Sequence, residues 1–74
     1  MNKFKEYALV SLKRSLVEGQ DFYSDHVGIE LPAGTQGVVL ELINENLLYV
    51  EFRHNGKTEY VTVLAKEVDL VLNQ

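Results

Sequence analysis

The Asn55-Gly56 pair constrains the fold most, because it joins two segments in which apolar and polar residues alternate. Both central residues of a type I′ hairpin turn need positive φ, and Asn-Gly is a favoured pair for that geometry. Residues 48–53 precede the turn and residues 60–64 follow it. Upstream, the stretch Gly34-Thr35-Gln36-Gly37-Val38-Val39 opens another apolar segment. The second half of the chain therefore predicts a meander of three antiparallel strands.

Successive side chains of a strand point to opposite faces of the sheet, so the alternation assigns an inner and an outer face. Residues 38–43 are almost all aliphatic, and we expect both faces of that strand to be covered. Residues 65–67 permit a short helical turn before a last strand over 68–72. We expect Tyr49, Arg53 and Tyr60 on the outer face. The expected core comprises Leu9 or its neighbours Val10 and Leu12, together with Val39, Leu42, Leu48, Val50, Phe52, Val61, Val63 and Val68.

Residues 4–17 have two interpretations. Phe4, Ala8, Leu12 and Leu16 recur every four residues, which is typical of an amphipathic helix. Residues 7–12 also fit a buried strand. The helix would give an α+β fold, with a three-stranded meander, and the strand would give an all-β fold.

Residues 18–35 read as a long loop, interrupted by three glycines and by Pro32. Proline disfavours helical geometry in the residue before it. A loop of this length in a small domain is uncommon and is often functional. Four acids and no Lys or Arg occupy residues 18–30: Glu18, Asp21, Asp25 and Glu30.

The 74 residues are enough for a single domain, residues 1–74, with a small core. The chain contains no cysteine, so neither disulfides nor thiolate-bound zinc can stabilise it. Five short strands with a long first loop favour a small five-stranded barrel, because closure protects strand edges. We therefore expect an all-β fold.

The order of these segments resembles the SH3-like barrels and, more narrowly, a family of short bacterial SH3-like domains of unknown function. The matching segments are residues 7–12, 34–39, 49–52 and 64–68. The resemblance implies an SH3-like barrel, offers no catalytic residues, and favours the strand interpretation of residues 7–12. It also implies a role as an accessory or neutralising partner of another protein. The acidic, aromatic stretch over residues 20–30 departs from the family.

Charge and hydropathy restrict the functional classes. The net charge is −4, and the acidic stretch disfavours nucleic acid, which is bound mainly through cations on phosphates. A nucleic-acid-binding barrel is kept as an alternative, with Tyr49, Tyr60 and Arg53 stacking on bases. Its backbone contacts would come from Lys3, Lys5, Lys13, Arg14 and Lys57. No apolar run is long enough for a membrane span or a signal peptide, so we expect a cytoplasmic protein.

Catalytic and metal-binding patterns are weak. Asp21, Asp25 and His26 lie close in sequence, but their spacing matches no recognised metal loop. There is no Gly-x-Ser-x-Gly elbow, and the glycines do not form a phosphate loop. We therefore expect no enzymatic activity, no metal and no cofactor.

Protein binding is the favoured function, because tyrosines with one polar tip are common at interfaces. The expected contact residues are Asp21, Phe22, Tyr23, Asp25, Tyr49, Arg53 and Tyr60. The acidic loop favours a basic partner, as an immunity protein, antitoxin or inhibitor would have. Alternatively, Phe22 or Tyr23 folds back to cap the core. A structural subunit of a larger assembly and a homo-oligomer also stay open.

Overall fold

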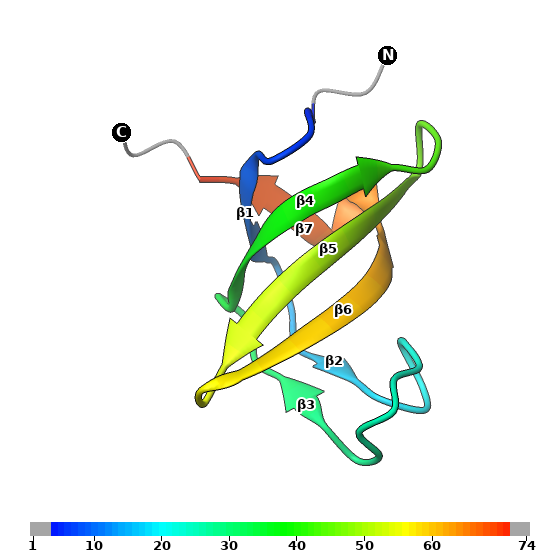
Figure 1. Ribbon diagram of the computed structural model, residues 1–74, viewed down its shortest axis with the longest axis vertical. Coiled ribbons are helices and arrows are strands. Elements are labelled where there is room, and N and C mark those ends of the chain that lie inside the picture. Colours follow the sequence, from blue (N-terminus) through cyan, green and yellow to red (C-terminus); the bar gives the residue numbers. More distant parts are fainter. Residues whose placement is uncertain (1–3, 72–74) are drawn as a thin grey trace.

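The computed structural model describes residues 4–71 and has an all-β architecture (Figure 1). The elements are β1 (Leu9–Leu12), β2 (Leu16–Val17), β3 (Glu30–Leu31), β4 (Gln36–Leu42), β5 (Leu47–His54), β6 (Lys57–Leu64), the 3-10 helix η1 (Ala65–Glu67) and β7 (Val68–Leu70). One antiparallel sheet has the strand order β6-β5-β4-β1-β7, and β2 pairs with β3 in a separate two-stranded sheet. No helix among the described residues is long and apolar enough to cross a bilayer.

The strand interpretation of the N-terminal segment is confirmed, and the helical alternative for residues 4–17 is wrong. Strand β1 lies between β4 and β7, with Leu9 opposite Val38 and Leu12 opposite Val68. Successive side chains of a strand point to opposite faces, and on β1 the alternate residues Val10 and Leu12 are buried. The four-residue spacing is therefore not evidence of a helix here.

The meander agrees with the alternation of its sequence. Asn55 and Gly56 have φ values of 54° and 75°, as a type I′ turn requires. On β5, the residues Leu48, Val50 and Phe52 are all buried. The expected helical turn over residues 65–67 is η1. The last strand ends at Leu70 in the structure, and Leu72 lies outside the described residues.

The expected coverage of both faces of residues 38–43 is wrong. The register of β4 against β5 shifts between Val39 and Glu41, after which Leu42 lies opposite Leu48. Leu42 is at the strand end and is 37% exposed, and Ile43 is also exposed. Leu42 is therefore not part of the core, because it lies at the end of β4 after the register shift.

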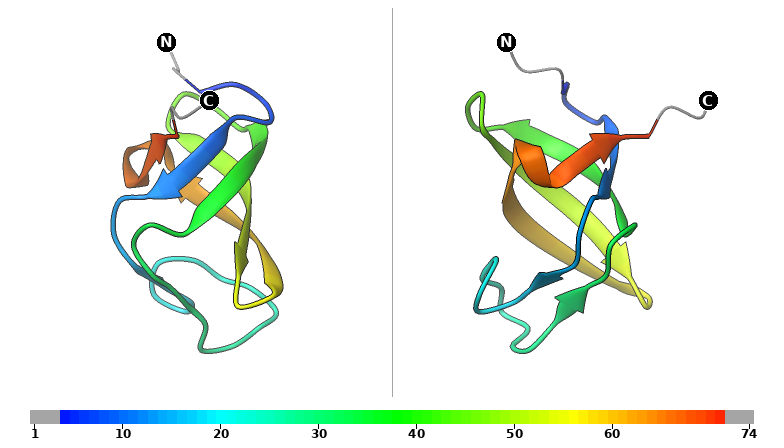
Figure 2. Two further views of the ribbon diagram at one scale, coloured as in Figure 1. Left: turned by 90° about the vertical axis from the view of Figure 1, so that its left-hand side faces the viewer. Right: turned by 180° about the vertical axis from the view of Figure 1, so that it is seen from behind.

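The sheet curls around the core and its two edge strands, β6 and β7, do not pair among the described residues (Figure 2). The two-stranded β2-β3 sheet lies below β6 in the view of Figure 1. It contributes buried apolar side chains from the first half of the chain. The core residues that the alternation did not indicate are Phe4, Leu16, Phe22 and Leu31.

Gly37 allows β4 and the ring of Phe52 to pack closely. A Cβ atom at Gly37 would lie 2.6 Å from Cδ1 of Phe52 and 2.7 Å from the carbonyl oxygen of Glu51. Gly37 is also opposite Val10 of β1, so it lies in the middle of the sheet. Phe52 is fully buried and fills the space that a side chain at Gly37 would take.

We predict that Gly37→Ala destabilises the fold by about 1–3 kcal/mol, because the added methyl group meets backbone as well as side-chain atoms. Chemical denaturation measures the free energy of unfolding. Gln36→Ala, at the exposed neighbouring position, is the matched control and should change stability little. Unchanged stability of the Gly37 variant would contradict the close packing of Gly37 against Phe52 and Glu51.

Candidate functional site

Glu59 is a charged residue on the inner face of β6. It follows the alternation of Val61 and Val63, lies opposite Phe52, and is only 3% exposed. Burying a carboxylate is costly unless hydrogen bonds replace its water. The long loop supplies them: the Ser24 hydroxyl donates to Oε1 of Glu59 at 3.0 Å, and Nδ1 of His26 lies 2.7 Å from Oε2. Glu59 therefore connects the loop to β6.

The loop is shaped locally for this contact. The backbone N–H of His26 donates to the Ser24 hydroxyl at 2.8 Å, which closes a tight turn. An ionised carboxylate only accepts hydrogen bonds, so the proton on the His26 ring lies on Nδ1. The His26 side chain is 56% exposed.

Phe22 is a second anchor of the loop, because its side chain is 3% exposed and belongs to the core. The prediction that Phe22 contacts a partner is therefore wrong, and the alternative that it caps the core is confirmed for this residue. The reason is the small core, which gains a large apolar side chain from the loop. Tyr23, the next residue, is 78% exposed.

An open depression of about 470 Å³ lies between the loop and β6. Its walls contain Tyr23, Asp25, Tyr49 and Tyr60, four of the residues expected at an interface. The rest of the lining is Ser24, His26, Thr58 and Glu59. The rings of Tyr49 and Tyr60 stack, with centroids 6.4 Å apart and planes inclined by 22°. We call these eight residues the tyrosine depression.

Arg53 and Asp21 lie outside the tyrosine depression. Arg53 is on the outer face of β5, where its Nη2 is 3.4 Å from Oε2 of Glu51. It lines a different depression, beside Leu9 of β1 and Val38 of β4. The prediction grouped these residues because it assumed that the loop lies beside the whole outer face of β5.

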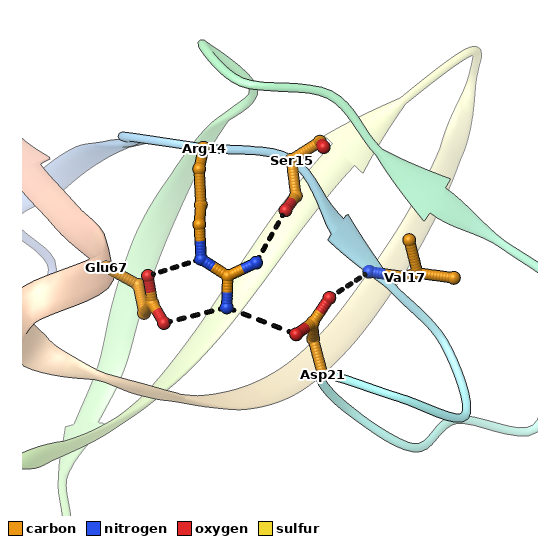
Figure 3. Close-up of polar contacts among 5 residues, drawn as sticks. All are labelled: Arg14, Ser15, Val17, Asp21 and Glu67. Atoms are coloured by element: carbon orange, nitrogen blue, oxygen red, sulfur yellow. Dashed lines mark hydrogen bonds and ion pairs between the residues drawn. The ribbon is translucent and has the colours of Figure 1, made fainter.

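Asp21 instead belongs to a network around Arg14 (Figure 3). The Arg14 guanidinium donates to both oxygens of Glu67 at 3.0 Å and to Oδ1 of Asp21 at 3.1 Å. It also donates to the carbonyl oxygen of Ser15, and Oδ2 of Asp21 accepts from the Val17 N–H at 2.8 Å. The network connects the start of the loop to η1, so Asp21 is a structural residue in this fold.

These contacts shift two pKa values. The hydrogen bond from Val17 and then that from Arg14 hold the pKa of Asp21 below its usual range. Hydrogen bonds to Glu67 and Asp21 raise the pKa of Arg14. Because the carboxyl pKa is lowered by folding, its contribution to stability is present above the ordinary aspartate value and is lost as the pH falls.

The site does not have the geometry of a hydrolytic triad. The Ser24 hydroxyl donates to Glu59, whereas the hydroxyl of a nucleophilic serine would donate to a ring nitrogen of the histidine that acts as its base. Metal ligation finds no support either, since no group of three or more His, Cys, Asp or Glu side chains within residues 4–71 could hold an ion. Asp21 and His26 point to different partners, Arg14 and Glu59.

Glu59 and Ser24 belong to the candidate site, but the sequence analysis did not predict them there. One signal was present: Glu59 occupies an inward position in the alternation that also predicts Val61 and Val63 inside. Its partners could not be found, because Ser24 and His26 are separated from it by 35 and 33 residues.

No family model, curated protein or solved structure matches this chain. The class that the geometry defines is thus a small all-β domain whose long loop is tethered to an edge strand beside exposed tyrosines.

We predict that His26→Ala lowers the free energy of unfolding by about 1–3 kcal/mol, because the buried Glu59 loses a hydrogen bond. Urea denaturation provides the measurement. His54→Ala, a histidine near the same strand but outside this cluster, is the control. Equal losses in the two variants would show that the bond to Glu59 adds nothing beyond packing.

We also predict a pH-dependent effect of Asp21→Asn. At neutral pH the variant should melt at a lower temperature than the wild type, and the gap should close as the pH falls below about 4. Thermal melts across the acid range test this. Asp25→Asn removes the same charge from the exposed part of the loop and is the control. A gap that does not depend on pH would contradict the assignment.

Proposed function

We propose that this chain is a non-catalytic protein-binding module built on an SH3-like barrel. It would act in the cytoplasm as a small accessory, immunity or antitoxin-like, or inhibitory partner of another protein. The barrel assignment is supported by the five-stranded antiparallel sheet, by its long first connection and by the family resemblance of its short motifs.

The tyrosine depression is the observation that carries the proposal. Tyr23 exposes most of its surface and Tyr60 about half, and neither belongs to the core. Tyrosine presents a large contact area with few rotatable bonds and is enriched among residues that dominate binding energy. The loop that presents Tyr23 is held by Phe22 and by the bonds to Glu59, so little order has to be gained on binding.

Charge supports a basic partner. Asp25 and Glu59 line the tyrosine depression, and no Lys or Arg of residues 4–71 does. Complementary charge accelerates association and excludes partners of like charge. Nucleic acid has less support, because Arg14 is held by two carboxylates and Lys13 lies 3.7 Å from Asp69. Lys3, named above for that alternative, lies outside the described residues.

We predict that Tyr23→Ala and Tyr49→Ala lose the native partner while melting like the wild type. The side chains line the depression and Tyr23 packs little against the core, so their loss should affect binding more than folding. Affinity purification from the native host with mass spectrometry, followed by titration of the captured partner at several salt concentrations, measures both partner identity and affinity.

Tyr7→Ala is the matched control, since Tyr7 is 71% exposed and does not line the depression. Binding should weaken as salt is raised, because exposed charges are screened. Retention of the partner by both depression variants would contradict the proposed function, as would equal loss in the Tyr7 variant.

A further inference from the structure

The free edge of β6 runs beside the tyrosine depression. Strand β6 is at one end of the five-stranded sheet and, in the part of the chain that the structure describes, pairs only with β5. In an antiparallel pair, hydrogen-bonded and non-hydrogen-bonded residue pairs alternate along the ladder. The two residues that flank a two-residue turn, here His54 and Lys57, form a hydrogen-bonded pair.

This phase determines which backbone groups of β6 face outward. Glu59, Val61 and Val63 bond to β5 in the same phase as Lys57. The bond from the Ala65 N–H to the Asn46 carbonyl, 2.8 Å long, continues that phase beyond the strand. Thr58, Tyr60 and Thr62 therefore direct their N–H and C=O groups away from the sheet. No hydrogen bond within residues 4–71 engages these outward groups.

Two depressions follow this edge. The tyrosine depression contacts residues 58–60 of β6, and a second depression of about 220 Å³ contacts residues 62–64. The loop forms the other wall of the first, through residues 23–26, and Asp21 with Arg14 and Glu67 lines the second. The loop lies below β6 in Figure 1 and in the right-hand view of Figure 2. The edge of β6 thus lines both depressions, and we call the two depressions together the track.

The charges along this track select its occupant. Its lining contains four carboxylates, those of Asp21, Asp25, Glu59 and Glu67, and one guanidinium. The single cation, on Arg14, already bonds to Asp21 and Glu67. A second copy of the chain would bring the same acids together, which is unfavourable. A segment rich in Lys or Arg would complement them.

Building on the proposed protein-binding function, we propose that β6 receives an extended basic segment of another protein as an additional antiparallel strand. The segment bonds to the outward groups of Thr58, Tyr60 and Thr62, in the mode known as β-strand addition. Its alternate side chains point to opposite faces, so those beside Glu59 and Asp25 are cationic. Those beside Tyr60, on the outer face, are apolar. Seven residues, roughly 20 Å long, span the track.

The probe is a capped heptapeptide of alternating Lys and Val. Its binding is followed by the amide chemical shifts and hydrogen exchange of the full chain. We expect shifts and new protection at Thr58, Tyr60 and Thr62, whereas the amides of Glu59, Val61 and Val63 are protected already.

Two N-methylated peptides separate backbone pairing from charge. Methylation of the backbone nitrogens of the Val residues removes the N–H donors that face β6 and should lower affinity about tenfold or more. Methylation of the backbone nitrogens of the Lys residues blocks only the peptide edge that faces away from β6 and should leave affinity unchanged. A Glu/Val heptapeptide should not bind.

Strand addition is overturned if the two methylated peptides bind equally, if the Glu/Val peptide binds as well, or if β6 shows no shift up to millimolar Lys/Val peptide. It is also overturned if the chain dimerises in sedimentation with protection of the same three amides. Failure of the proposed function is a separate result: the native partner would then be retained by Tyr23→Ala and Tyr49→Ala, whatever the peptides do.

Discussion

The buried carboxylate of Glu59 is the constraint on which the arrangement of the loop depends. It occupies an inward position of an edge strand, beside apolar residues, where lost hydration has to be replaced. The hydroxyl of Ser24 and the ring of His26 replace it. Because both residues belong to the long loop, satisfying one charge also brings the loop against β6. An inward charge on an edge strand also discourages indiscriminate pairing with other apolar strands.

Two further anchors complete the loop. Phe22 inserts into the core, and the Arg14 network joins Asp21 to Glu67 beside the last strand. A long connection with only a two-residue strand at each end would otherwise be mobile. Phe22 buries apolar surface, and the directional hydrogen bonds fix the orientation of the loop. Together they explain why Tyr23 faces solvent next to the stacked pair of Tyr49 and Tyr60.

The proposed function and the architecture both depend on β6. Its inner face belongs to the core and to the loop, its outer face carries Tyr60, and its edge has unpaired backbone groups. The same strand can therefore contribute apolar contact, charge and main-chain hydrogen bonds to one partner. A domain with a small core can provide such a surface without a deep cavity, because extended segments bind along edges rather than in pockets.

The sequence by itself determined what depends on neighbouring residues: the three-stranded meander, the type I′ turn at Asn55-Gly56, and the inner and outer faces of β5. Alternation and turn geometry act over a few residues, so they can be read directly. Only the tertiary structure decided that Phe22 is buried, that Asp21 pairs with Arg14, and that Ser24 meets Glu59. These contacts join residues far apart in the chain or reflect competition for a small core. Their geometry is set by how the curled sheet brings β6 and the loop together.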